Sequence, residues 1–258
     1  MSNDENRPET HVTSTAIGTY YANPARRPAS ARVLFNGFAR HYNLVNRIFS
    51  LGSGAWYRRR CLREAGVAPG AVVIDVAMGT GLLAHEAQRL IQGRGMVIGV
   101  DLSELMLAEA RKSLAIPLIQ ATAEELPLAD GIADFVTMGY ALRHLSDIGR
   151  ALREANRLLR PGGKLVLLEI SPPRNPAIGV VLRIVAGHVL PALSALVARN
   201  HEAKALMDYH WRTIASYPPP QAVLGATSDA GFQEAQCTSE FDFFRFYRAI
   251  KTEVQNYC

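Results

Sequence analysis

The hydrophobic positions of this chain follow two periods, and the change from one to the other falls near residue 68. Over residues 33–63, apolar and aromatic residues recur at intervals of three and four, with a Gly-rich break at Gly52 and Gly54. This period predicts two helices. Farther along, short runs of Val, Ile and Leu alternate with segments of helical period. We therefore expect a helical cover over residues 33–67, followed by an α/β domain over residues 68–258.

Five apolar runs have the composition of strands that are buried on both faces of a sheet. Each run is nearly continuous in apolar residues and leads into a segment with a helical or turn pattern. The regular alternation predicts a doubly wound, mostly parallel sheet. A last strand-like section, residues 233–249, follows an Asp-Ala-Gly-Phe turn. The five runs are residues 71–78, 95–101, 116–128, 133–142 and 164–170.

Two segments depart from this alternation. Residues 1–32 have no hydrophobic period and end in a Pro/Arg/Ala stretch, which indicates a flexible N-terminal arm. Residues 174–217 form a helical insert, of which residues 178–198 are apolar and about long enough to span a membrane. Arg183 lies inside this stretch and Pro191 interrupts it, and a charge at bilayer depth costs a few kcal/mol. We therefore expect two broken helices that cover an apolar surface.

The composition is that of an ordinary globular protein. Apolar types make up 48% and charged types 20% of the 258 residues, which excludes a wholly disordered, collagen-like or coiled-coil chain. Cys61, Cys237 and Cys258 lie far apart and form no CxxC pair, so neither a disulfide framework nor a zinc site is expected. We expect no metal and a reducing cytoplasm.

The net charge of +5 is compatible with an anionic lipid or an acidic partner and is weak evidence for nucleic acid. Part of this charge lies in a dense basic turn formed by Arg58, Arg59, Arg60 and Arg63. Two interpretations of the turn stay open. It is either a solvated helix face or a contact with an anionic surface or substrate.

Three groups of residues at the ends of the predicted strands suit a nucleotide-like ligand, because ligands of open parallel sheets bind beyond the carboxyl ends of the strands. The turn of residues 77–81 is Gly-rich, so a ligand can approach its backbone and the N–H groups of the next helix. Asp101 follows Gly81 at a spacing that suits a carboxylate accepting hydrogen bonds from ribose hydroxyls. Residues 122–124, after the third strand, suit an adenine edge.

The glycines alone leave the ligand open. Gly79, Gly81 and Ala84 also fit the dinucleotide fingerprint G-x-G-x-x-A, which keeps an NAD(P)-dependent dehydrogenase as an alternative. Asp75 argues against it, because an acidic residue beside the Gly-rich turn suits a cationic ligand better than an anionic pyrophosphate. S-adenosylmethionine carries both an ammonium and a sulfonium group.

Long motifs follow one another in a specific order: FNGFARHYNLVNRIFSLGSGAWYRR, VVIDVAMGTG, VIGVDLSELML, ATAEELPLADGIADFVTMGYALRHLSD and ALREANRLLRPGGKLVLLEIS. Together they resemble class I S-adenosylmethionine-dependent methyltransferases, and within that group the chain is similar to the quinone C-methyltransferases of the UbiE/MenG type, from about Phe35 to Phe232. The resemblance implies a Rossmann-like seven-stranded sheet and S-adenosyl-L-methionine as cofactor, with S-adenosyl-L-homocysteine as product. The implied reaction is C-methylation of a quinol ring in prenylquinone biosynthesis.

The resemblance also implies which residues hold the cofactor. The family's positions fall on Thr80, Asp101, the pair Thr122-Ala123, and Gly139, of which Thr80 and Asp101 keep the family residue. Together with the Gly-rich turn, the expected cofactor-binding residues are Asp75, Ala77, Gly79, Thr80, Gly81, Asp101, Leu102, Thr122, Ala123 and Gly139.

The expected catalytic residues are Arg143, His144 and Tyr42. In a quinol, removing a hydroxyl proton raises the electron density of the ring carbon that attacks the methyl group. Arg143 is suited to binding a phenolate through charge-assisted hydrogen bonds. His144 is suited to acting as the general base, because an imidazole titrates near neutral pH. A strand-end histidine bonded to backbone is the alternative for His144. The residues expected in the substrate pocket are Tyr140, Tyr209 and Trp211, with ordinary packing as their alternative.

The early helix and the insert are expected to close over the substrate and exclude water. The expected partners are a small apolar or aromatic substrate, no nucleic acid, a peripheral membrane contact and a second copy of the chain. The chain departs from the family at two places: Tyr42-Asn43 stands where the family has Tyr-Asp, and Arg143-His144 stands where it has Arg-Asn. The identity of the methyl acceptor therefore stays open. The alternatives are another small molecule, such as a natural product, a phenol or a phospholipid amine, and a diverged reaction on the same cofactor.

Overall fold

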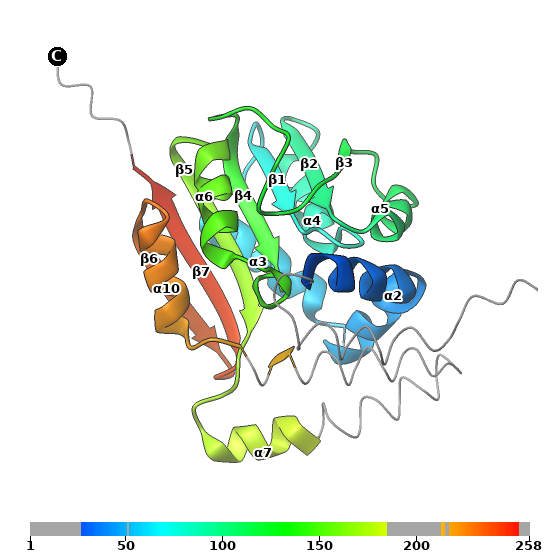
Figure 1. Ribbon diagram of the computed structural model, residues 1–258, viewed down its shortest axis with the longest axis vertical. Helices are drawn as coiled ribbons and strands as arrows, with labels where there is room; N and C mark the ends of the chain where they lie inside the picture. Colours follow the sequence, from blue (N-terminus) through cyan, green and yellow to red (C-terminus); the bar gives the residue numbers. More distant parts are fainter. Residues whose placement is uncertain (1–26, 51, 185–212, 215–216, 253–258) are drawn as a thin grey trace, which may run out of the picture.

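The computed structural model describes residues 27–50, 52–184, 213–214 and 217–252. One seven-stranded sheet, with strand order β3-β2-β1-β4-β5-β7-β6, forms the centre of the described part of the chain (Figure 1). This confirms the predicted doubly wound, mostly parallel, seven-stranded sheet. The strands are β1 (Val72–Val76), β2 (Met96–Asp101), β3 (Leu118–Gln120), β4 (Ala133–Gly139), β5 (Leu159–Ile170), β6 (Phe232–Glu240) and β7 (Phe244–Lys251).

Six of the seven strands run in one direction, and β7 alone runs against them. β1 pairs with β2 and β4 in parallel register, and the carboxyl ends of these strands therefore meet at one edge of the sheet. β7 runs antiparallel between β5 and β6. The single strand-like section expected over residues 233–249 is thus two strands. The chain reverses between them at Phe241 and Asp242, both of which have positive φ.

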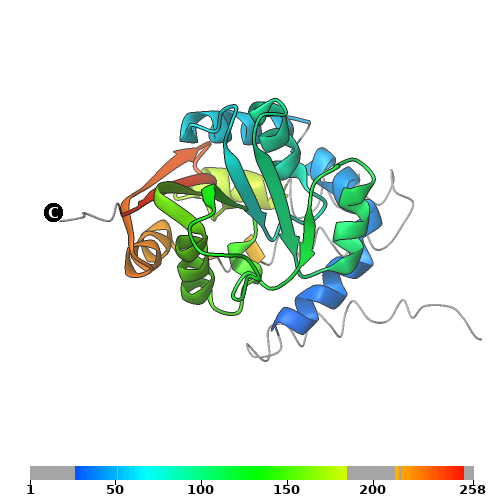
Figure 2. The same cartoon turned by 90° about the horizontal axis from the view of Figure 1, so that it is seen from above.

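Helices cover both faces of the sheet, as Figure 2 shows from above. Two apolar layers of side chains lie between the sheet and these helices, one on each face. Side chains alternate along β1, so Val73 packs with one layer while Ile74 and Val76 pack with the other. The helices are α2 (Arg27–Phe49), α3 (Gly54–Ala65), α4 (Leu82–Ile91), α5 (Glu104–Arg111), α6 (Ile148–Leu158), α7 (Pro176–Ile184) and α10 (Pro220–Asp229), with a short 3₁₀ turn, η2 (Leu142–His144).

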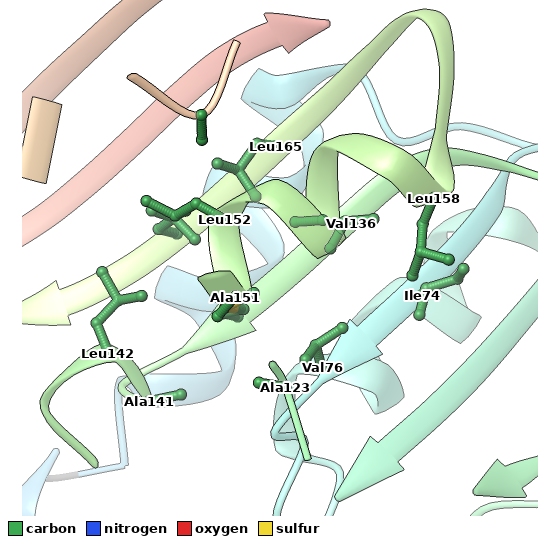
Figure 3. Packing of buried hydrophobic residues seen from close by; sticks show 14 of the residues in the cluster. Ile74, Val76, Ala123, Val136, Ala141, Leu142, Ala151, Leu152, Leu158 and Leu165 are labelled. Atoms are coloured by element: carbon green, nitrogen blue, oxygen red, sulfur yellow. The ribbon is translucent and has the colours of Figure 1, made fainter. Parts of the chain in front are cut away.

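Helix α6 illustrates how the period of the sequence becomes packing. Its apolar positions recur at three and four, and Ala151, Leu152, Ala155 and Leu158 are all fully buried. Figure 3 shows Leu152 and Leu158 packed over the β-strand residues of the same layer. Asp147 caps the helix, because its carboxylate accepts a hydrogen bond from the N–H of Arg150 (2.8 Å). The cap therefore sets where α6 begins, shortly after the end of β4 and the turn η2.

The cover is helical, as expected, but its first helix starts earlier than the sequence indicated. Helix α2 begins at Arg27, inside the range assigned to the arm, and residues 1–26 lie outside the described residues. Of the insert, α7 is described, whereas residues 185–212, with Tyr209 and Trp211, lie outside the described part. Among the helices that the structure describes, none is long and apolar enough to cross a membrane.

Candidate functional site

A hollow of about 720 Å³ lies at the carboxyl ends of β1 to β4, where parallel sheets bind ligands. Loops that follow the four strands form its floor, and α2 covers one side. Its wall contains seven of the ten residues predicted to hold the cofactor: Ala77, Gly79, Asp101, Leu102, Thr122, Ala123 and Gly139.

Asp101 is held in place by the backbone. The N–H of Gly79 donates to its Oδ2 (2.7 Å) and the N–H of Ser103 to its Oδ1 (2.8 Å). Burial raises the pKa of Asp101 to about 6, although these two backbone bonds lower it. A carboxylate has lone pairs for about four hydrogen bonds, so Asp101 can still accept from a ligand hydroxyl in the hollow.

The turns at the ends of β1 and β4 carry unusual backbone conformations. Ala77 and Tyr140 have φ of 53° and 62°, a region that residues other than glycine rarely occupy. Such outliers concentrate at functional sites. Gly79 also has positive φ, and a Cβ there would meet only the Tyr42 ring, at 3.9 Å, so its backbone lies open to the hollow. The Gly-rich turn is therefore shaped for the close approach of a ligand.

Three predicted cofactor-binding residues lie behind this surface. The fully buried Asp75 accepts hydrogen bonds from the N–H of Ala84 (2.9 Å) and the hydroxyl of Thr137 (2.7 Å). Burial raises the pKa of Asp75 to about 7. Thr80 donates its hydroxyl to the side chain of Asn43 on α2 (2.5 Å). A Cβ on Gly81 would lie 2.3 Å from Leu114, so position 81 needs glycine. These residues shape the Gly-rich turn from inside instead of lining the hollow.

The far end of the hollow is apolar. Leu102, Met106, Ala123 and Leu145 line it, beside the backbone of Thr122. Glu124 belongs to the same wall, but its carboxylate is bonded to the N–H and hydroxyl of Ser146 (3.0 and 2.9 Å). Apolar side chains in the same hollow as the Asp101 carboxylate suit an adenine joined to a ribose. The residues present therefore fit the expected cofactor.

A second hollow, of about 840 Å³, adjoins the first. Tyr42 and Tyr140 line both, so the two hollows meet at these side chains. Burial raises the pKa of Tyr42, and it raises that of Tyr140 to about 12, so both side chains are neutral phenols at pH 7. The aromatic residues of the second hollow are Tyr42, Trp56, Tyr57, Tyr140, Phe241 and Phe244.

The two predicted catalytic residues of η2 divide between the hollows. Arg143 lines the second hollow, and its guanidinium forms a buried ion pair with Glu169 on β5 (3.0 Å). Burial raises the pKa of Glu169 to about 7, against the effect of Arg143. His144 lines the first hollow, where its ring meets the edge of Phe35 at 5.0 Å. The structure thus brings Tyr42, Arg143 and His144 together where the hollows meet.

Helix α2 is fastened to the loop that carries Asp101. The Ser103 hydroxyl donates to Oδ1 of Asn36 (2.6 Å), and Nδ2 of Asn36 donates to Glu104 (3.0 Å). Arg32 adds an exposed ion pair with Glu104 (2.9 Å). One wall of the first hollow is therefore a helix that these polar contacts join to the loop after β2, in addition to its buried side chains Leu34 and Phe38.

Sequence reasoning did not single out Asn36, Phe35 or Glu169. Asn36 has Arg32 and Arg40 four residues away on either side, so the sequence pattern carries no signal that distinguishes it from an exposed polar position. Glu169 follows the apolar run Leu165–Leu168, where a lone carboxylate at the end of a buried strand is a signal for a partnered charge.

The comparisons with known sequences agree on one family. The model of the ubiE/COQ5 methyltransferase family matches residues 25–241. The ubiquinone/menaquinone biosynthesis C-methyltransferase UbiE of Shewanella woodyi is 31% identical over 216 residues, which cover 81% of this chain and 85% of that protein. The protein of the same name from Hahella chejuensis is 34% identical over 205 residues, which cover 77% and 81%.

Solved structures share the fold at low identity. An S-adenosylmethionine-dependent methyltransferase from Thermotoga maritima, described as a possible histamine N-methyltransferase, aligns with a TM-score of 0.59 and 22% identity, covering 85% of this chain and 100% of that one. Phosphoethanolamine N-methyltransferase 2 of Haemonchus contortus, in complex with S-adenosylmethionine, aligns with a TM-score of 0.55 and 15% identity, covering 76% and 52%.

Proposed function

Since the chain belongs to the ubiE/COQ5 methyltransferase family, it is an S-adenosylmethionine-dependent methyltransferase, and we propose that it methylates a ring carbon of a prenylated quinol. The relatives that match most of its length are named for this reaction in ubiquinone and menaquinone biosynthesis. The observation that carries the proposal for this chain is the pair of adjoining hollows. One has the residues for an adenosyl group, and the other has aromatic walls for a ring.

The first hollow would hold the cofactor through a few residues. Asp101 would accept hydrogen bonds from the ribose hydroxyls, and the slot between Leu102 and Ala123 would take the adenine ring. The open backbone of Gly79 would face the amino-acid part. When bound, S-adenosylmethionine supplies an electrophilic methyl group on a sulfonium.

The residues at the junction of the hollows would prepare the acceptor. The rings of Tyr42 and Tyr140 would align the acceptor ring with the first hollow, which lowers the entropic cost of the reaction. His144 would take the proton of a ring hydroxyl, and the Arg143 guanidinium would stabilise the resulting phenolate. Helix α2 would keep water away from the junction.

Methyl transfer to defined acceptors tests the proposal. The full-length enzyme is incubated anaerobically with S-adenosylmethionine and a reduced prenylated benzoquinone or naphthoquinone, and the product is examined by mass spectrometry and NMR. We expect one added methyl group on a ring carbon, and less product with Asp101→Asn when S-adenosylmethionine is below saturation. A methyl group on oxygen or nitrogen, or no binding of S-adenosylhomocysteine, would contradict the proposal.

We further propose that the enzyme works in the cytoplasm and meets its acceptor at a membrane surface. Trp56 and Phe241 line the second hollow and are 60% and 74% exposed, and the Arg60 guanidinium lies 5.5 Å from the Trp56 ring centre. Exposed aromatic and basic side chains at the mouth of an apolar hollow suit a lipid interface. Flotation with vesicles containing phosphatidylglycerol should recover the protein at low salt, and less of Trp56→Ser. Absence of the wild type from the vesicle fraction at low salt refutes this part.

A further inference from the structure

The structure divides the basic turn into one inward and three outward arginines. Arg59 pairs with Glu86 (2.6 Å), Arg60 pairs with Glu64 and Glu240 (2.7 and 2.9 Å), and Arg63 is exposed. Arg58, in contrast, is only 8% exposed, and it lines the second hollow. The solvated-face interpretation therefore holds for most of the turn but not for Arg58.

Arg58 has aromatic contacts but no carboxylate partner among the described residues. Its guanidinium lies over the Tyr140 ring, 5.6 Å from the centre, and no ion pair or hydrogen bond of its side chain occurs in that part of the chain. Space for the guanidinium is provided by Gly54, because a Cβ at that position would lie 2.8 Å from Nη1 of Arg58. The fold thus makes room for a buried cation without pairing it directly with a carboxylate, and Asp75, which is bonded to Ala84 and Thr137, interacts with it only through space.

The other charges of the second hollow are already compensated. Arg143 is paired with Glu169, and Glu240, the carboxylate of this wall, is paired with Arg60. Tyr42 and Tyr140 are neutral, as described above. Among the described residues, Arg58 therefore leaves the wall of the hollow with an excess of positive charge.

A buried charge that lacks a partner costs several kcal/mol, so it is retained in proteins mainly where an anion will meet it. Here the cation faces a chamber with aromatic walls. We propose that Arg58 determines the specificity of the acceptor by binding an anionic oxygen on its ring, either a carboxylate or an ionised hydroxyl other than the one assigned above to Arg143. This inference rests on the proposed function, because it assigns the second hollow to the acceptor.

Three naphthalene probes of similar size test the inference. The full-length protein, saturated with S-adenosylhomocysteine, is titrated by calorimetry with 2-naphthoate, 2-naphthamide and 2-naphthol at pH 7. The variants are Arg58→Met, which removes the charge, and Arg58→Lys, which keeps it. Arg63→Met is the matched control, because Arg63 lies on the same helix but is exposed.

We expect the wild type to prefer an anion. If the ligand group is a carboxylate, 2-naphthoate binds at least about tenfold more tightly than 2-naphthamide. If it is an ionised hydroxyl, 2-naphthol releases about one proton on binding, measured in two buffers of different ionisation enthalpy. Either preference should disappear in Arg58→Met and persist in Arg58→Lys and Arg63→Met. Equal binding of all probes without proton release, no binding of any probe, or an anion preference that survives in Arg58→Met overturns the inference.

The stability of the acceptor-free protein separates a binding role from a structural one. Because Arg58→Met removes an uncompensated buried charge, its Tm should equal or exceed that of the wild type. A clearly lower Tm would assign Arg58 to the fold and contradict the inference. S-adenosylhomocysteine should bind the wild type and Arg58→Met equally. Failure of the wild type to bind it would instead refute the proposed function.

Discussion

At the scale of the residue, two aspartates at the ends of adjacent strands have different tasks because their surroundings differ. The side chain of Asp75 lies in the interior, where its two carboxylate oxygens accept hydrogen bonds from Ala84 and Thr137. Asp101 ends at the wall of the first hollow, where lone pairs stay available to a ligand. Both follow apolar strands, so the sequence pattern alone makes them alike.

The affinity for S-adenosylhomocysteine should depend on the ionisation of Asp101. Its pKa is raised to about 6, and only the carboxylate accepts two ribose hydrogen bonds. The affinity should therefore be constant above pH 7 and fall below pH 6, by up to about tenfold per pH unit. Calorimetry between pH 5 and 8 measures this. In Asp101→Asn, the affinity should be about tenfold lower and independent of pH, and a pH dependence that survives there argues against this assignment.

Replacing His144 should separate turnover from binding. If His144 takes the hydroxyl proton, His144→Gln should lower kcat by about 100-fold while the dissociation constant of S-adenosylhomocysteine changes less than about threefold. The remaining activity should rise with pH, because hydroxide then replaces the lost base. Steady-state kinetics between pH 6 and 9 provides the test. An unchanged kcat would favour the alternative of a packed, backbone-bonded histidine.

At the scale of the element, α2 is the helix that covers one side of the first hollow. Its polar side chains fasten it to the loop after β2 and to Thr80, and its Phe35 meets His144. Such contacts are individually worth about 1 kcal/mol, less than the burial of a large apolar face. The buried side chains of Leu34 and Phe38 keep α2 in the packed structure, so the polar contacts mainly determine how closely the helix lies over the loop after β2.

Loosening α2 should therefore affect binding more than stability. Asn36→Ala removes the bonds to Ser103 and Glu104, and we expect a five- to tenfold weaker affinity for S-adenosylhomocysteine with a Tm within about 2 °C of the wild type. Gly37→Ala is the matched control, because a Cβ there meets nothing within 4 Å and alanine favours the helix. It should leave the affinity unchanged. A large fall of the Tm in Asn36→Ala would show that α2 is part of the cooperative fold.

At the scale of the whole molecule, the strand order brings both hollows to one edge of the sheet. The carboxyl ends of β1, β2, β3 and β4 converge there, and buried carboxylates collect with them. Asp75 and Asp101 have pKa values raised to about 7 and 6. The site is therefore assembled at a cost in stability, as functional sites often are.

The stability of the ligand-free protein should fall as the pH rises. An acid whose pKa is higher in the folded than in the unfolded chain binds protons more tightly when folded, so its contribution is lost on going from about pH 4 to pH 7. Between pH 5 and 8, Asp75 should lower the free energy of unfolding by about 3 kcal/mol, and Glu169, whose pKa is also raised to about 7, should lower it by a similar amount, measured by urea denaturation. Asp75→Asn should remove its own share of this decrease, and an unchanged slope in that variant would contradict the raised pKa.

The oligomeric state also belongs to this scale. The expected homodimer stays a prediction, which the mass of the particle in solution would measure.

The sequence by itself determined the order of strands and helices, because the period of apolar residues records which faces are buried. It also located Asp101, Gly79 and Ala123, since residues that end buried parallel strands must lie at the ligand edge. Family motifs added the cofactor and the reaction.

Only the tertiary structure decided which side chains line the two hollows. The hydroxyl of Thr80 donates a hydrogen bond to Asn43. Of the four arginines in the basic turn, only Arg58 is buried and lines the second hollow. Local sequence cannot resolve such choices, because the direction of a side chain depends on what other elements place against it. Here the packing of α3 against the sheet, and the space that Gly54 leaves, give Arg58 its position in the second hollow.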